Sequence, residues 1–333
     1  MFLRKSDYHR RSHNGQALHN WELLVDFTPT QQHGSLANIE HFTKHAGGAP
    51  ANVAAVCAKL GQQAALLTQV GQDAFGDFLI KTLQQAGVDT QFIRQSTDGE
   101  TSLAFVSLNE HGERDFQFYR RHAADLLYKQ EYLPSQLLTA HDIVHFCSVN
   151  LVECPMKQAH LALIEQAHQA GSLISFDPNV RLPLWQDKTA CCETILAFLP
   201  KAHIVKLSEE ELLFLTTLED EQEAVQTLFK GYVEVIIITH GAAGATLYTK
   251  KHHMKAPANK VQTVDTTGAG DAFIGAILSQ FLHHQLTVDQ VVAHCEQYAM
   301  SLLSFANGYA GISTTKHGAI PSYPVLSLDM NLG

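Results

Sequence analysis

The run DTTGAGDAF, from Asp265 to Phe273, combines residue types that handle phosphate groups and protons. Apolar residues recur at helical spacing from Phe273 to Phe281, so the glycines are predicted to lie at a helix N-terminus. Glycines let backbone N–H groups approach an anion, and the helix dipole adds positive charge there. Asp271 falls in the first turn, where a carboxylate can accept a proton. An isolated G-x-G-D also suits a structural turn, so the pattern alone leaves both interpretations open.

A second glycine-containing run, GGAPANVA, extends from Gly47 to Ala54. Apolar residues follow it at helical spacing, Pro50 suits the first helical position and Gly61 suits the C-terminal cap. The run therefore predicts a helix that begins beside two glycines. Judged from this pattern alone, Asn52 is an ordinary residue of the helix surface.

Short β-branched runs alternate with helical patterns along the chain. The predicted strands are Leu23–Phe27, Ala64–Val70, Ile143–Val149, Leu173–Phe176, Ile204–Leu207 and Val235–Thr239, and a further β-rich run, Val261–Val264, precedes the DTTGAGDAF run. This alternation predicts an α/β fold whose central sheet is mostly parallel, with helices on both faces. Ligands of such sheets collect at the carboxyl ends of the strands. Asp177 and Asn179 follow one predicted strand at that position.

Residues 102–121 have a different pattern. The alternation from Phe116 to Tyr119 and the turn residues Glu110–Glu113 predict a β-hairpin. A hairpin set into an α/β chain is either a lid over a site or an ordinary edge hairpin, and the pattern leaves both open.

Composition excludes several classes of protein. The net charge of −10 argues against a nucleic-acid-binding surface, which needs clustered Lys and Arg. No apolar run approaches the roughly 20 residues of a membrane span, and no signal peptide is recognisable. The six cysteines form no C-x-x-C pair, so we expect reduced thiols and a cytoplasmic protein.

The two glycine-containing runs resemble the two signatures of the ribokinase-like (PfkB) carbohydrate kinases. The resemblance implies a ribokinase-like fold with a small β lid, and implies that Gly268, Ala269 and Gly270 form an anion hole beside the catalytic base Asp271. It also implies that a sugar is bound by Asp271 together with four further residues, namely Asp26, Gly47, Gly48 and Asn52.

The resemblance extends to the nucleotide and the ions. It implies that ATP is bound by Ser208, Thr239, Gly241, Gly244, Gly268, Gly270 and Asn307. It places Glu211 near Mg²⁺ through water. It implies a K⁺ site, mostly of backbone oxygens, at Asp265, Thr267, Ser313, Lys316, Gly318 and Ser322. It also implies a homodimer formed through the lid.

Within this family the chain is most similar to fructokinases. The similarity rests on FYR at 118–120, on FDPNVR at 176–181 and on Trp185, and it makes Arg120 and Arg181 candidate sugar ligands. For Arg181 a surface ion pair is an equal alternative. Aminoimidazole riboside kinases are similar in the same regions, and a kinase-like sugar sensor without turnover is an alternative from another class. A P-loop and a complete dinucleotide fingerprint are both absent from the sequence.

The resemblance gives a kinase domain at residues 22–324, with a lid formed in part by about 100–122, an atypical segment at 1–21 and a tail at 325–333. The start departs from the family, because Trp21 stands before Glu22 where a glycine is usual, and residues 14–20 are too polar to predict a central strand. Ser208 also stands where many members have Asn, although its hydroxyl can still bind water.

Overall fold

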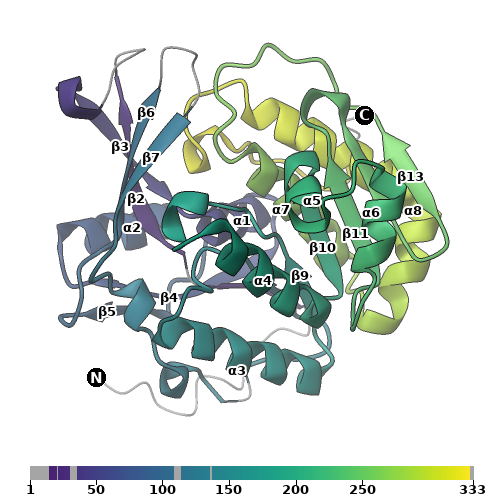
Figure 1. Cartoon of the computed structure of the whole chain (residues 1–333), viewed down its shortest axis with the longest axis horizontal. Helices are drawn as coiled ribbons and strands as arrows, with labels where there is room; N and C mark the ends of the chain where they lie inside the picture. Colours follow the sequence, from purple (N-terminus) through teal and green to yellow (C-terminus); the bar gives the residue numbers. More distant parts are fainter. Residues whose placement is uncertain (1–14, 21, 31–35, 109–113, 136, 331–333) are drawn as a thin grey trace.

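The computed structural model describes residues 15–20, 22–30, 36–108, 114–135 and 137–330. Trp21 and the predicted turn Glu110–Glu113 lie outside the described residues. In the described part, two sheets divide the chain into a large α/β body and a lid that projects from it (Figure 1). No described helix is both long and apolar enough to cross a membrane.

The main sheet has nine strands in the described residues. In spatial order they are β13 (His253–Ala256), β12 (Ala245–Tyr248), β11 (Val235–Thr239), β10 (Ile204–Ser208), β9 (Leu173–Phe176), β8 (Ile143–Phe146), β1 (Gln16–Asn20), β4 (Gln63–Gly71) and β5 (Ile93–Ser96). Neighbouring strands are parallel from β11 to β5, and β12 and β13 add an antiparallel edge. The expected α/β fold with a mostly parallel sheet is confirmed.

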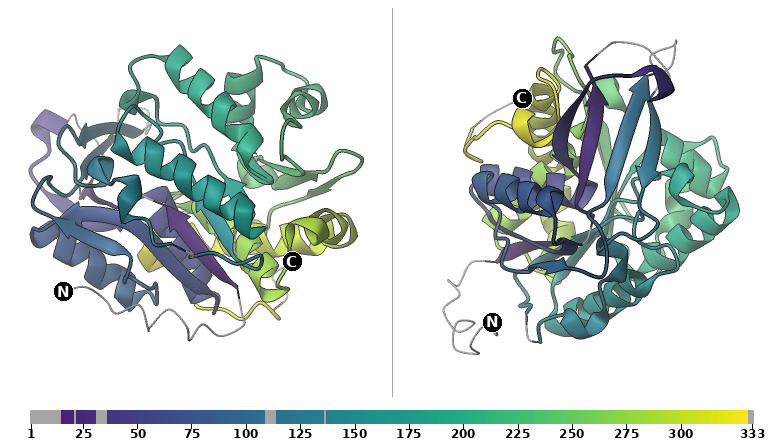
Figure 2. Two further views of the ribbon diagram at one scale, coloured as in Figure 1. Left: turned by 90° about the horizontal axis from the view of Figure 1, so that it is seen from below. Right: turned by 90° about the vertical axis from the view of Figure 1, so that its left-hand side faces the viewer.

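Helices cover both faces of this sheet (Figure 2). One layer contains α1 (Ala49–Lys59), α2 (Ala74–Gln85), α7 (Ala269–His283) and α8 (Val288–Ser313). The other contains α3 (Pro155–Ala170), α4 (Lys188–Phe198), α5 (Glu209–Thr216) and α6 (Glu221–Leu228). Successive strand residues point to opposite faces, so Ala17 joins the core under the first layer and Leu18 the core under the second. Short 3-10 helices are η2 (Leu36–Asn38), η3 (Asp125–Leu127), η4 (Gln130–Tyr132), η5 (Leu182–Leu184), η6 (Leu199–Lys201), η7 (Gly241–Ala243) and η8 (Ile320–Ser322).

The lid is a four-stranded sheet in the order β3 (Phe42–Gly47), β2 (Leu24–Pro29), β6 (Leu103–Leu108) and β7 (Arg114–Tyr119). The predicted hairpin corresponds to β6 and β7, which pair antiparallel. The assignment of Leu23–Phe27 to the main sheet is wrong, because β2 pairs with β3 and β6. The β-rich run Val261–Val264 is not a strand, and Val264 is half exposed.

The expectation that residues 14–20 are too polar for a central strand is also wrong. The strand β1 pairs in parallel with both β4 and β8. Two of its polar residues, Gln16 and His19, are buried, and the Gln16 backbone N–H donates to Asp142 Oδ1 at 2.8 Å. Ala17 and Leu18 supply the apolar contacts on the two faces of the sheet.

Two buried imidazoles lie side by side in the centre of the main sheet. The rings of His19 and His145 are 5.6 Å apart, and no described residue bonds to either ring nitrogen of His19. Burial lowers the pKa of His19 well below its usual value, and burial lowers the pKa of His145 to about 3. Both rings are therefore neutral in the folded protein at physiological pH.

These histidines predict an acid-sensitive fold. Their pKa values are lowered on folding, so the unfolded chain binds more protons below its own pKa of about 6.5, and stability falls as the pH falls. Each histidine should remove about 2 kcal/mol of unfolding free energy between about pH 7.5 and pH 5. Urea unfolding of His19→Leu should show a correspondingly smaller loss, and His145→Leu serves as the matched variant. Equal losses in wild type and both variants would contradict this account.

Candidate functional site

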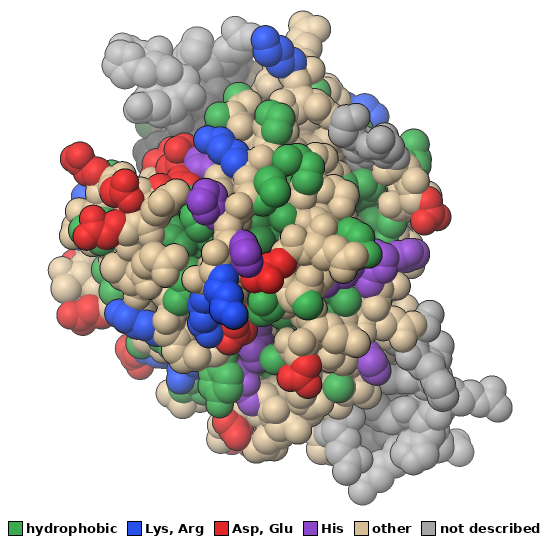
Figure 3. Space-filling view, turned by 90° about the vertical axis from the view of Figure 1, so that its right-hand side faces the viewer, with side chains coloured by type: hydrophobic (Ala, Val, Ile, Leu, Met, Phe, Trp, Pro, Cys, Tyr) green, Lys and Arg blue, Asp and Glu red, His purple; other side chains and the backbone are tan. Residues whose placement is uncertain are grey.

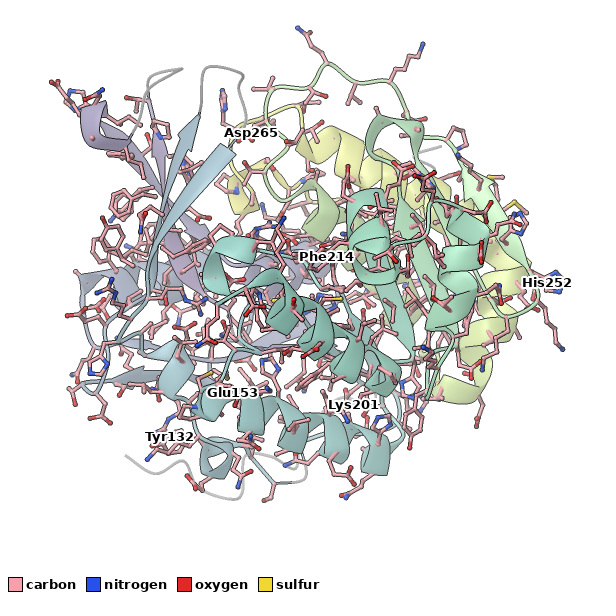
Figure 4. All side chains as sticks on the ribbon, viewed as in Figure 1. Tyr132, Glu153, Lys201, Phe214, His252 and Asp265 are labelled. Carbon is pink, nitrogen blue, oxygen red and sulfur yellow. The ribbon has the colours of Figure 1, made fainter. Side chains whose placement is uncertain are left out.

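A cavity of about 770 Å³ lies between the lid and the carboxyl ends of the main strands. The lid contributes alternate residues of its inner face, including Asp26, Thr28 and Phe118. The body contributes residues that follow β9, Lys206 of β10 and the start of α7. In Figure 4, Asp265 marks the edge of this region, between the lid strands and the helices at the C-terminal end of the chain.

The glycine turn of the DTTGAGDAF run begins α7, as predicted. Gly268 is the N-terminal cap with a φ of 73°, and a Cβ added there would lie 2.3 Å from the Tyr323 hydroxyl oxygen. This hydroxyl donates a hydrogen bond of 3.0 Å to the Gly268 carbonyl oxygen. A side chain at this position would therefore displace Tyr323, whose hydroxyl holds the turn in place.

Asp271 and Asn52 meet across the interface of α7 and α1. The Asn52 Nδ2 donates to Asp271 Oδ2 at 2.8 Å, and both side chains line the cavity while being more than nine-tenths buried. Gly275 lets the helices approach, because a Cβ there would lie 2.6 Å from a Val56 methyl carbon. The description of Asn52 as a helix-surface residue, drawn from the helical pattern alone, is wrong.

The same contacts set the charge of Asp271. Burial raises the pKa of Asp271, whereas the hydrogen bond from Asn52 and the positive charges of Lys206 and Arg181 lower it. The resulting pKa of Asp271 lies above the usual value for an aspartate, which makes this carboxylate a stronger base than an exposed one. The site therefore has a basic carboxylate next to a row of backbone N–H groups.

Lys206 and Asp177 form a buried ion pair of 3.0 Å on the cavity wall. Burial raises the pKa of Asp177 to about 7, although the Lys206 ammonium opposes this rise. Burial would lower the pKa of Lys206, but the carboxylates of Asp177 and Glu211 raise it above its usual value, so the lysine stays charged. The sequence analysis missed Lys206, although a lysine inside the apolar strand β10 was a signal for it.

The glycines at Gly47 and Gly48 allow the lid to join the cavity floor. A Cβ added at Gly47 would lie 1.9 Å from Asp26 Oδ2, and Gly48 has a φ of 105° with Glu22 O only 2.3 Å from such a Cβ. In the pairing of β2 with β3, Leu24 is opposite Gly47, so Asp26 lies two residues from the point where the lid joins the body. Asp26, Gly48 and Asn52 all line the cavity.

The two predicted arginines occupy different places. Arg181 is half-buried, lines the cavity and donates to the Val180 carbonyl oxygen at 3.0 Å. Arg120 is buried outside the described cavity lining, where it pairs with Asp125 and donates to the Ser102 Oγ at 3.2 Å. Its charge opposes the rise in the pKa of Glu22 that burial causes. Arg120 therefore influences the cavity electrostatically, through Glu22, which does line it.

Of the predicted nucleotide residues, Gly268 and Gly270 line the cavity, whereas the other five lie outside its lining. Ser208 and Thr239 are opposite one another at the ends of β10 and β11. Gly244 and Asn307 converge on Ala256: the Asn307 Nδ2 donates to its carbonyl oxygen at 3.1 Å, and a Cβ at Gly244 would lie 2.1 Å from that oxygen. Gly241, with a φ of 54°, begins the turn between β11 and β12.

Glu211 is held by two backbone groups. Its Oε2 accepts from Ser208 N at 2.9 Å and its Oε1 from Val180 N at 2.7 Å, while Ser208 Oγ accepts from Glu211 N. Ser208 and Glu211 thus form a capping box at the start of α5, which the spacing S-x-x-E could have predicted. Each carboxylate oxygen retains a lone pair for water, which fits a hydrated Mg²⁺.

Asp265 joins two loops beside the glycine turn. Its Oδ1 accepts from the Thr267 N–H and hydroxyl at 2.9 and 2.6 Å, and its Oδ2 accepts from Gly318 N at 2.9 Å. Ser313 and Ser322 donate their hydroxyls to the carbonyl oxygens of Ala310 and Ala319, respectively. Lys316 is exposed. These side chains fix the loops, so a cation here would depend mostly on backbone oxygens.

Comparisons with known proteins agree on one family. Residues 18–326 match the sequence profile described as pfkB family carbohydrate kinase. The probable fructokinase-4 of Arabidopsis thaliana is 40% identical over 307 residues, which cover 92% of this chain and 93% of that protein. A fructokinase from Vibrio cholerae O395, in its form with bound fructose, ADP and calcium ion, has a TM-score of 0.83 and 33% identity over 93% of this chain and 96% of its own. Aminoimidazole riboside kinase from Salmonella enterica has a TM-score of 0.79 and 28% identity over 93% and 96% of the two chains.

The Asp177–Lys206 pair predicts a pH-dependent loss of stability in Lys206→Met. Removing one partner of a buried pair typically costs about 3–5 kcal/mol. The Asp177 pKa should rise further, so the folded variant binds a proton that the unfolded chain lacks, and the loss should be smaller at about pH 5 than at about pH 8. Urea unfolding at both values measures this, with Lys206→Met/Asp177→Asn as the control that restores stability. A loss of equal size at both values would rule out an uncompensated Asp177 as its cause.

Proposed function

Because this chain belongs to the pfkB family of carbohydrate kinases, we propose that it is an ATP-dependent fructokinase that converts fructose to fructose 6-phosphate. The observation that carries the proposal is the pairing of Asp271 with the glycine turn at one end of a cavity large enough for a sugar. The similarity to proteins named fructokinase over nine-tenths of the chain supports the choice of sugar.

In this mechanism the sugar lies between Asp26 and Asn52, with its primary hydroxyl at Asp271. The hydroxyl oxygen attacks the γ-phosphorus of ATP, the bond from that phosphorus to the β–γ bridging oxygen breaks, and ADP leaves. Asp271 accepts the hydroxyl proton, and the N–H groups from Gly268 to Gly270 hold the charge that develops on the phosphoryl oxygens. Lys206 adds a fixed positive charge on the cavity wall.

The remaining predicted site residues keep roles in this proposal. The nucleotide is held by Ser208, Thr239, Gly241, Gly244 and Asn307. The sugar side of the cavity is shaped by Gly47 and Gly48. Arg181 acts on the sugar directly, and Arg120 acts on it through Glu22. Glu211 would hold Mg²⁺ through water, and the ion would supply positive charge against the phosphates. The lid excludes water from the cavity.

The location and assembly stay predictions. The six cysteines are all unpaired, which supports the cytoplasmic location expected from the sequence. A homodimer through the lid is supported by Tyr119, which is 61% exposed on the lid. Light scattering of the purified protein measures the oligomeric state.

A substrate panel tests the choice of sugar. With ATP and Mg²⁺, we expect kcat/KM to be highest for fructose, and lower for ribose, aminoimidazole riboside, 2-keto-3-deoxygluconate and adenosine. Aminoimidazole riboside is the strongest competitor, because the Salmonella riboside kinase shares the fold over 93% of this chain. A higher kcat/KM for that riboside would replace the fructokinase assignment. Sugar binding without ADP release would instead favour a sensor.

Asp271→Asn tests the chemistry. It should lower kcat by about 10²–10⁴-fold, because Asn keeps the shape but cannot accept the proton. In the wild type, kcat/KM should fall as the pH falls and Asp271 becomes protonated, beginning above the usual aspartate range because burial raises this pKa. ATP affinity and Tm should change little. A structural role predicts the reverse, namely a loss of about 1 kcal/mol in stability with turnover nearly intact.

A monovalent cation is proposed for the loops that Asp265 joins. Potassium there would neutralise charge beside the glycine turn, so kcat should rise when K⁺ replaces tetramethylammonium at equal ionic strength. Asp265→Asn should abolish the difference between the two salts. Equal rates of the wild type in both salts would remove the cation from the proposal.

A further inference from the structure

Three potential metal ligands meet outside the cavity, at the carboxyl ends of β10 and β11. Glu209 begins α5, Glu221 begins α6 and His240 follows β11 directly. The His240 Nδ1 lies 2.9 Å from Glu209 Oε1 and 3.6 Å from Glu221 Oε2, and the three ligand atoms all lie within 4.8 Å of one another. Residues far apart in the sequence thus converge on one point.

Further contacts fix the orientation of two of these side chains. The His240 side chain is 4% exposed, and its Nε2 lies 2.9 Å from Thr246 Oγ1, so its Nδ1 is aimed at the two carboxylates. The other oxygen of Glu221 accepts a hydrogen bond from the Tyr248 hydroxyl. Hydrogen bonds of this kind commonly hold the outer side of metal-binding imidazoles and carboxylates. Glu209 is 58% exposed, which leaves a path by which an ion can enter.

The donor set selects the class of ion. One imidazole nitrogen and two carboxylate oxygens are ligands of Zn²⁺ and similar divalent transition metals, at bond lengths of about 2.0–2.2 Å. Tetrahedral ligands at such lengths lie about 3.4 Å apart, and the 2.9 and 3.6 Å separations from His240 Nδ1 fall on either side of this value. Mg²⁺ prefers an all-oxygen octahedral site. The geometry points to a Zn²⁺-class site formed by Glu209, Glu221 and His240, with water as the fourth ligand.

This site lies beside the predicted nucleotide residues, because Glu209 follows Ser208 and His240 lies between Thr239 and Gly241. None of its three residues lines the cavity between the lid and the body. An ion bound here ties the starts of α5 and α6 to the turn after β11, so it stabilises the folded chain by mass action. The expected properties are one bound metal ion per chain and a Tm that rises with the concentration of free Zn²⁺.

The experiment uses full-length, chelator-treated protein without nucleotide. Zn²⁺ affinity is measured by competition with a chromophoric chelator, and Co²⁺ binding by visible absorption. His240→Gln and Glu221→Gln should each lower the affinity at this site by at least about tenfold. The matched control is Glu223→Gln, which removes the same charge from α6 outside the cluster. Several histidines are exposed on the face shown in Figure 3, so Zn²⁺ binding outside the cluster is measured in the same titrations.

The Tm of each protein with and without Zn²⁺ separates a metal site from a charged network. A Zn²⁺-dependent rise in Tm should occur in the wild type and in Glu223→Gln, and should be lost in the two ligand variants. Equal Zn²⁺ affinity in the wild type and both ligand variants would overturn the site. A lower Tm of these variants that is the same with and without Zn²⁺ would also overturn it, and would assign the cluster to hydrogen bonding between His240 and the two glutamates.

Discussion

The hydrogen bond from Asn52 to Asp271 is the contact on which the rest of the site depends. It joins the first turns of α1 and α7, two helices that begin next to glycines and pack closely because Gly275 lies against Val56. A carboxylate that is 8% exposed would otherwise be costly to ionise. The amide of Asn52 and the ammonium of Lys206 favour the ionised form without neutralising it by direct contact in an ion pair.

A second constraint is the join between the two sheets. The chain leaves β1 at Asn20 and enters the lid at Leu24, and it returns from β3 at Gly47 to begin α1 at Ala49. Glu22 of the first connection and Gly48 of the second line the cavity, and Gly47 and Gly48 have no room for a side chain. The residues on the sugar side of the cavity are therefore positioned by the same two connections that attach the lid to the body.

Local pattern was sufficient for the elements that have strong periodicity. The helix after Gly268, the strand Leu173–Phe176 and the hairpin of β6 and β7 could all be predicted. Residues whose role depends on distant contacts could not. Lys206 needs Asp177, which comes from another strand, and the burial of Asn52 needs α7. The strand β1 escaped prediction because Asp142 accepts the hydrogen bond of the Gln16 backbone N–H and His19 is buried in its neutral form, neither of which has a local signature.

The polar residues of β1 matter while the chain is being synthesised. Ribosomal synthesis delivers residues 16–20 before β4, at 63–71, and long before β8, at 143–146, so this central strand waits without either neighbour. An unpaired strand of β-branched residues is an aggregation hazard during that interval. Gln16 and His19 keep the waiting segment hydrated, and they lose water only when the later strands close around it. A strand that lies between two neighbours in the native sheet is thus also suited to being exposed in the nascent chain.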